Sequence, residues 1–183
     1  MVDSGAQEQL VKYLIDAHAM EEQSVQLLDK GSSIIGDEQI ARIYRAHLMQ
    51  SQEHREHILK RLEAHGERPS RVKDLATKVG ALGIGGAALA APDTPVKLSA
   101  AAFAFENLEI ASYRFLRRIA ERAGDTETVS VVDRILEQEE AAAELVAGTF
   151  DRALEVTLGE QASSPLTPVT PIGKPSDRPR EAQ

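Results

Sequence analysis

Residues 66–95 have the sequence GERPSRVKDLATKVGALGIGGAALAAPDTP. Glycine and proline recur along this stretch, and both residue types interrupt helices. The stretch is far longer than an ordinary connection between two helices. On both sides of it lie long segments that contain almost none of these residues. We therefore expect two helical units joined by one long connection.

The positions of the helix-breaking residues predict four long helices. All eight prolines lie outside these helices, and Gly148 is the one glycine within them. Ser4 and Gln7 form a candidate capping box for the first helix, which Gly31 is expected to end. Asp37 is a suitable N-cap for the second helix. The predicted helical blocks are 6–30, 37–65, 96–122 and 126–158.

The lengths of the connections indicate the topology. Short links at 31–36 and 124–125 make their flanking helices antiparallel neighbours, whereas 66–95 is long enough to cross over the bundle. The predicted fold is an all-α, ferritin-like antiparallel four-helix bundle with a long crossover between helices two and three. We expect the bundle to comprise residues 1–159, with a short helix at 70–79 in the crossover. Residues 160–183 are expected to form a proline-rich disordered tail.

The composition excludes several classes of function. The 183 residues carry a formal net charge of −8 and include no cysteine, which excludes disulfides, thiol catalysis and thiolate metal sites. The acidic balance argues against nucleic-acid binding, since no basic stripe is present. No signal peptide is visible, and no apolar stretch is long enough to span a membrane. A cytoplasmic protein is expected.

Each predicted helix carries an acid or a histidine near its midpoint, inside the stripe of apolar residues that should face the core. In the first helix, Glu21 falls within the stripe that contains Leu14 and Leu28. A buried unpaired carboxylate is costly, so four such helices indicate that these groups meet one another or share a cation. The candidate residues are Glu21, His47, His54, Glu106, Glu109 and Glu139.

Carboxylates and imidazoles together suit iron, manganese or zinc. The pattern is also compatible with a metal-free polar network that fixes the register of the helices. His54 is predicted to lie closer to the cluster than His57 or His65, and the carboxyl groups of the four candidate glutamates are predicted to converge. Glu22, His57 and Glu140 are predicted to be solvated or flanking, and His18 and His65 are predicted to be helix-edge residues.

Several linked motifs resemble the YciE/YciF-type ferritin-like family over about residues 5–158. They are YLIDAHAMEEQ at 13–23, HLMQSQEH at 47–54, AFENLEIASYRFL at 104–116 and ILEQEEAAAEL at 135–145. The resemblance implies a bacterial protein that is associated with stress responses. The wider ferritin-like superfamily implies di-iron ligands of the types that Glu21, His54, Glu106, Glu109 and Glu139 provide.

The chain departs from the superfamily pattern at two positions. Ser51 stands three residues before His54, where the pattern has a glutamate. Ala142 stands three residues after Glu139, where the pattern has a histidine, so His47 is the candidate substitute. These departures leave a weaker, altered or vestigial metal site as an alternative to a ferroxidase.

Three classes of function follow from these observations. The first is a ferritin-like protein with a di-nuclear site for iron or manganese, acting in stress-related iron or peroxide handling. The second is a metal-free helical structural or interaction protein with a vestigial site. The third, a phosphate- or nucleotide-binding enzyme, has only the glycine-rich segment 80–86 in its favour. The pattern leaves open whether the protein is an enzyme.

The expected partners are metal ions, with no nucleic acid and no membrane, and a homo-oligomer is left open. Leu166, Val169 and Ile172 recur every third residue between prolines of the tail. A polyproline II helix would place them on one edge. This spacing indicates a segment that docks on a partner or on its own bundle, whereas accidental spacing in a solubilising tail is the alternative.

Overall fold

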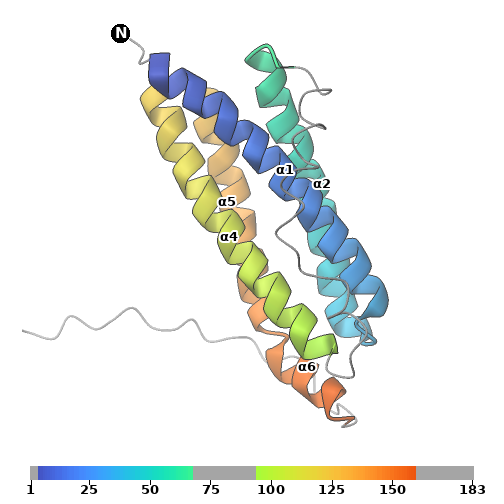
Figure 1. Cartoon of the computed structure of the whole chain (residues 1–183). Helices are drawn as coiled ribbons and strands as arrows, with labels where there is room; N and C mark the ends of the chain where they lie inside the picture. Colours follow the sequence, from blue (N-terminus) through green and yellow to red (C-terminus); the bar gives the residue numbers. More distant parts are fainter. Residues whose placement is uncertain (1–3, 68–93, 160–183) are drawn as a thin grey trace, which may run out of the picture.

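The computed structural model describes residues 4–67 and 94–159. These residues form five helices and no strand (Figure 1). The helices are α1 (Ser4–Ile34), α2 (Glu38–Ala64), α4 (Thr94–Ala123), α5 (Thr126–Ala147) and α6 (Phe150–Thr157). Within these ranges, no helix combines the length and the apolar character that crossing a membrane requires.

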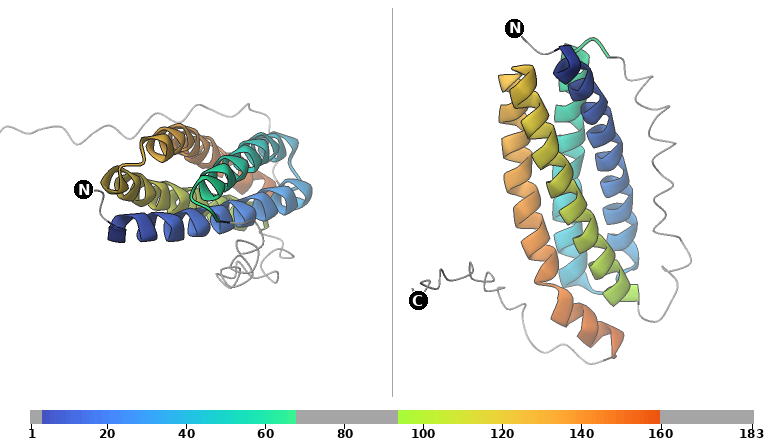
Figure 2. Two further views of the ribbon diagram at one scale, coloured as in Figure 1. Left: turned by 90° about the horizontal axis from the view of Figure 1, so that it is seen from above. Right: turned by 60° about the vertical axis from the view of Figure 1, so that its left-hand side comes forward.

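The four long helices form two antiparallel hairpins, α1–α2 and α4–α5, that pack side by side (Figure 2). Gln7 Nε2 donates to the carbonyl oxygen of Ala123 at 3.0 Å, so α1 begins where α4 ends. His65 Nε2 lies 2.8 Å from Asp125 Oδ2, so α2 ends where α5 begins. The helices α2 and α4 therefore run in the same direction, so the end of α2 and the start of α4 lie at opposite ends of the bundle. The predicted bundle topology is confirmed.

The predicted helix at 70–79, the glycine-rich segment 80–86 and the tail at 160–183 lie outside the described residues. The polyproline pattern of the tail therefore stays a prediction.

The first helix was predicted to end at Gly31. This prediction was wrong, because α1 continues to Ile34. Gly31 lies inside the helix, where the ring of Tyr44 approaches so closely that a Cβ atom would lie 3.0 Å from Tyr44 Cδ2 and Cε2. The turn instead uses Gly36, whose φ of 74° favours glycine. Asp37 caps α2 as predicted, because its side chain accepts hydrogen bonds from the backbone N–H groups of residues 39 and 40.

The fourth helix was predicted to be continuous over 126–158. It is interrupted at residues 148–149, which separate α5 from α6. Thr149 is buried, and its hydroxyl donates to the carbonyl oxygen of Val146 at 2.7 Å. The following helix, α6, is held to the start of α2 by Arg152, whose Nε and Nη2 donate to Asp37 Oδ2 at 2.7 and 2.5 Å. Phe150 packs edge-on against Phe103 of α4, with ring centroids 5.4 Å apart.

Two apolar clusters fill the bundle, one towards each end. One contains the starts of α1 and α5 and the ends of α2 and α4, including Leu14, Leu62 and Leu116. The other surrounds Tyr44 and includes Leu98. In α1, α2 and α4, buried polar residues lie between the segments that belong to the two clusters. In α5, the buried polar residue is Glu139, between Leu136 and Ala143 of the first cluster. The bundle is thus divided at mid-height by a polar layer.

Candidate metal centre

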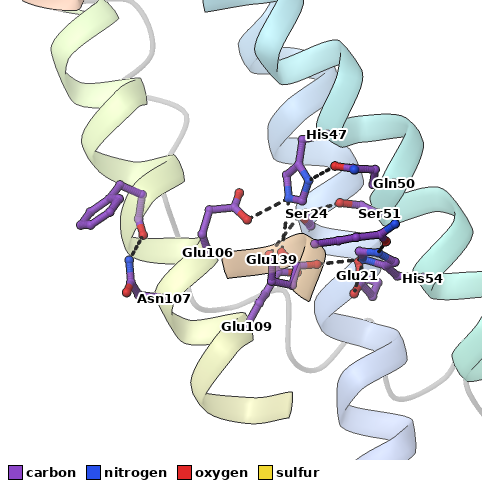
Figure 3. Close-up of polar contacts among 12 residues, drawn as sticks. Glu21, Ser24, His47, Gln50, Ser51, His54, Glu106, Asn107, Glu109 and Glu139 are labelled. Atoms are coloured by element: carbon purple, nitrogen blue, oxygen red, sulfur yellow. Dashed lines mark hydrogen bonds and ion pairs between the residues drawn. The ribbon is translucent and has the colours of Figure 1, made fainter. Parts of the chain in front are cut away.

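The polar layer contains all six residues that the sequence singled out. Each is at most 3 % exposed, and together they come from four helices (Figure 3). The side chains of the four glutamates converge with two imidazole rings inside the bundle, as their positions on the apolar stripes predict. They are Glu21 from α1, His47 and His54 from α2, Glu106 and Glu109 from α4, and Glu139 from α5. Their role as metal ligands stays a prediction.

The first group of candidate ligands surrounds His47. Its Nε2 lies 2.8 Å from Glu106 Oε2 and 3.4 Å from Glu139 Oε2. Glu109 completes the group, and the four ligand atoms all lie within 4.8 Å of one another. One imidazole and three carboxylates therefore face a common point.

The second group surrounds His54. Its Nδ1 lies 2.8 Å from Glu139 Oε1 and 3.5 Å from Glu21 Oε1. Because Glu139 turns one oxygen towards each group, it belongs to both. Glu139 would therefore help to hold an ion in either group.

The outer nitrogen of each ring faces a glutamine. His47 Nδ1 lies 3.1 Å from Gln50 Oε1, and His54 Nε2 lies 2.6 Å from Gln138 Oε1. A carboxamide oxygen only accepts hydrogen bonds, so each of these outer ring nitrogens carries a proton whether the ring is neutral or an imidazolium ion. The inward nitrogens, Nε2 of His47 and Nδ1 of His54, are the ones that face the carboxylates.

The inward-facing atoms are close together but are not aligned as hydrogen bonds. Neither inward ring nitrogen has a hydrogen-bond partner, although each has an oxygen within 2.8 Å. Both oxygens of Glu139 and one oxygen of each other glutamate in the layer also lack a partner. Ligand atoms that bind one octahedral ion side by side at about 2.1 Å are roughly 3 Å apart. The separations and the donor types therefore fit a divalent metal.

The electrostatics of the cluster are dominated by burial and by mutual contacts. Burial alone would lower the pKa values of the two histidines, but the neighbouring carboxylates outweigh it and raise them to about 11 for His47 and about 10 for His54. Burial raises the pKa of Glu106 to about 7 and that of Glu109 well above its ordinary value. The two rings outweigh the burial of Glu139 and lower its pKa to about 2. Without a metal, the rings are therefore imidazolium ions that offset the carboxylates.

Sequence reasoning missed further polar contacts in the layer. The Tyr113 hydroxyl donates to Glu21 Oε1 at 2.5 Å, and burial among carboxylates raises the pKa of this phenol well above 10. Ser24 Oγ lies 3.3 Å from Ser51 Oγ and donates to Glu109 Oε2 at 3.4 Å. Tyr113 lies four residues after Glu109 on the same helix, α4. That spacing is the signal that could have identified it as a partner of the cluster.

The residues predicted to flank the stripes divide into two sets. His57 is half-buried, and Glu140 is exposed and paired with Arg114. His18, which was predicted to be a helix-edge residue, is buried, with 6 % of it exposed. His65 contacts Asp125 at the end of the bundle, so only His47 and His54 among the described histidines reach the cluster.

A groove of about 240 Å³ opens between α1 and α4. Its walls are mainly apolar and include the rings of Tyr13, Phe105 and Phe115. Met20 and Ser112 also line it, and each directly precedes one member of the Glu21–Tyr113 pair. The groove thus lies at the height of the polar layer, on the outer side of the contact between the two helices.

Residues 5–157 match a protein family that is described as a domain of unknown function (DUF892). The chain belongs to this family. The match confirms the resemblance to the YciE/YciF-type family that the motifs indicated.

Three solved structures of bacterial proteins have similar folds. A protein from Xanthomonas campestris pv. campestris is 26 % identical with a TM-score of 0.70, and the similarity covers 85 % of this chain and 97 % of that protein. The Escherichia coli stress protein YciF is 21 % identical with a TM-score of 0.64, over 87 % of this chain and 100 % of YciF. The protein YcfI from Rhodopseudomonas palustris is 22 % identical with a TM-score of 0.63, over 80 % of this chain and 94 % of YcfI.

Proposed function

We propose that the polar layer is a di-nuclear metal site for iron or manganese, and that the protein acts in stress-related iron or peroxide handling. The observation that carries this proposal is the set of buried ligand atoms without hydrogen-bond partners, which face two points on either side of Glu139. Four carboxylates also match the charge of two divalent ions. The description of Escherichia coli YciF as a stress protein supports the physiological part.

The chain's own residues would divide the work of the site. His47, Glu106 and Glu109 would hold one ion, Glu21 and His54 the other, and Glu139 both. Iron or manganese bound there would supply redox chemistry towards dioxygen or peroxide. The phenol of Tyr113 orients Glu21, and the two apolar clusters keep bulk water away from the ends of the layer. The groove between α1 and α4 offers a small oxidant a place beside the site.

The test is metal binding by protein purified without a histidine tag and stripped of metal. We expect about two equivalents of Fe²⁺ or Mn²⁺ per chain, and anomalous scattering from two positions beside Glu139. Glu139→Gln should lose both ions, because this carboxylate belongs to both groups. Glu140→Gln is the matched control, since Glu140 is the next residue but is exposed. Equal metal contents of the two variants would contradict the proposal.

The second candidate is a metal-free structural or interaction protein. It is favoured by the raised histidine pKa values, which let two imidazolium ions offset carboxylates without any metal. Such a buried polar layer would fix the register of the helices. Wild-type protein that binds neither Fe²⁺ nor Mn²⁺ would favour this candidate.

A further inference from the structure

We propose that Gln50 and Gln138 each set the metal affinity of one position in the layer, by holding that position's histidine with the binding nitrogen facing inward. This inference rests on the proposed metal site. It concerns two residues whose carboxamide oxygens face the outer nitrogens of the two histidines.

The first position depends on Gln50 through His47. The two residues are three apart on α2, and Gln50 Oε1 faces His47 Nδ1 at 3.1 Å. The ring therefore keeps its proton on Nδ1 and presents Nε2 to Glu106, 2.8 Å away. Rotation of the ring about its Cβ–Cγ bond would break the contact with Gln50 and remove Nε2 from its place.

The second position depends on Gln138 through His54, and the ring is held by its opposite edge. Gln138 Oε1 faces His54 Nε2 at 2.6 Å, so Nδ1 is the nitrogen that faces Glu139. A half-turn of this ring about its Cβ–Cγ bond would present a carbon atom to the carboxylate. The helix α5 thus supplies two consecutive residues to the position, the shared carboxylate and the amide that orients His54.

The two glutamines are independent of each other. Gln50 contacts a histidine of its own helix, whereas Gln138 reaches across from α5 to α2. Partners of this kind raise the basicity of the ligand nitrogen and fix its orientation, and their loss typically weakens metal binding by about 10- to 100-fold. Each replacement should therefore weaken one position and spare the other.

The experiment titrates metal-free full-length protein with Zn²⁺ or Cd²⁺ and follows two binding events by calorimetry. Gln138→Leu should weaken one event by about 10- to 100-fold, and Gln50→Leu should weaken the other by a similar factor. Gln52→Leu is the control, because Gln52 is exposed on the same helix as Gln50. Gln138→Glu retains an acceptor oxygen at the same place and should retain the affinity, which a purely space-filling role would not predict.

A spectroscopic measurement on the wild-type protein does not depend on the folding of any variant. With ¹¹³Cd bound and histidine labelled with ¹⁵N, coupling to cadmium should appear at Nε2 of His47 and at Nδ1 of His54. Coupling at the opposite nitrogens would overturn the inference. The inference would also be overturned if Gln50→Leu and Gln138→Leu bound metal as tightly as Gln52→Leu. A single replacement that weakened both metal-binding events equally would overturn it as well. If the wild-type protein binds neither Zn²⁺ nor Cd²⁺, the inference fails together with the proposed metal site.

Discussion

Loading the polar layer with two divalent ions should release protons, and the pKa values of the cluster give a lower limit to their number. His47 and His54, with pKa values of about 11 and 10, are both protonated at pH 7 in the metal-free protein. Each ring must lose one proton before its inward nitrogen can bind an ion. Glu106, with a pKa of about 7, adds about half a proton. The sum is about 2.5 protons at pH 7, and the raised pKa values of Glu21 and Glu109 act in the same direction.

The number of released protons also determines how the metal affinity depends on pH. Protons and metal ions compete for the same atoms, so metal binding strengthens as the pH rises. A release of about 2.5 protons corresponds to a rise of roughly 300-fold in the overall binding constant for two ions between pH 6.5 and 7.5. The histidine contribution to this dependence should persist until the pH approaches 10, where His54 loses its proton in the metal-free protein.

Calorimetric titration with Zn²⁺ in two buffers of different ionisation enthalpy measures the released protons directly. His54→Ala should lower the number by about one and weaken binding. His57→Ala should change neither quantity, because His57 does not contact the cluster. Release of fewer than two protons by the wild-type protein would refute the reasoning, since it would mean that the two rings are not imidazolium ions before metal binds.

Three further perturbations test the packing around the site. Tyr113→Phe removes the hydroxyl that donates to buried Glu21, and it should lower the free energy of unfolding of metal-free protein by about 1–3 kcal/mol; an unchanged urea midpoint would contradict this. Gly31→Ala should destabilise by about 1–3 kcal/mol, because the new Cβ meets the buried ring of Tyr44 at 3.0 Å and the clash exceeds the gain in helix propensity; a raised melting temperature would show that the ring can move. Deletion of 161–183 should leave circular dichroism and metal uptake unchanged, because the described helices all end before it; loss of either would contradict this.

The bundle could be predicted because its determinants are local. Glycine, proline and capping residues mark the ends of helices, and the unequal lengths of the links distinguish a crossover from an up-down-up-down bundle. The predicted helix ends were wrong where tertiary contacts, and not local sequence, determine the structure. Gly31 was expected to end α1, but it is needed inside the helix where Tyr44 approaches. The helix before α6 ends with Gly148 as its C-cap, and Thr149 is buried with its hydroxyl on the carbonyl oxygen of Val146; that contact is not visible in the sequence.

The charged members of the site could also be predicted, because a carboxylate within an apolar stripe is costly unless it has a partner. Their uncharged neighbours could not. Gln138 occupies a half-buried position next to Glu139, and its contact with His54 joins residues 84 positions apart. From the sequence, a glutamine at such a position is expected to be a solvent-exposed surface residue. Its contact with a histidine depends on which residue lies opposite it in the bundle, and the sequence does not show that.

The arrangement of the two histidines shows most clearly where sequence reasoning ends. His47 and His54 are seven residues apart, which places them on one face of α2 but separates their backbones by roughly 10 Å along the helix axis. Both rings nevertheless meet one carboxylate, that of Glu139, at opposite oxygens. They do so because His47 presents its far nitrogen, Nε2, and His54 its near nitrogen, Nδ1. Helical periodicity therefore predicts that both rings face the core, whereas their meeting at one residue depends on ring orientation. In this way α2 supplies both imidazoles of the layer, although Ala142 of α5 stands where the superfamily pattern has a histidine.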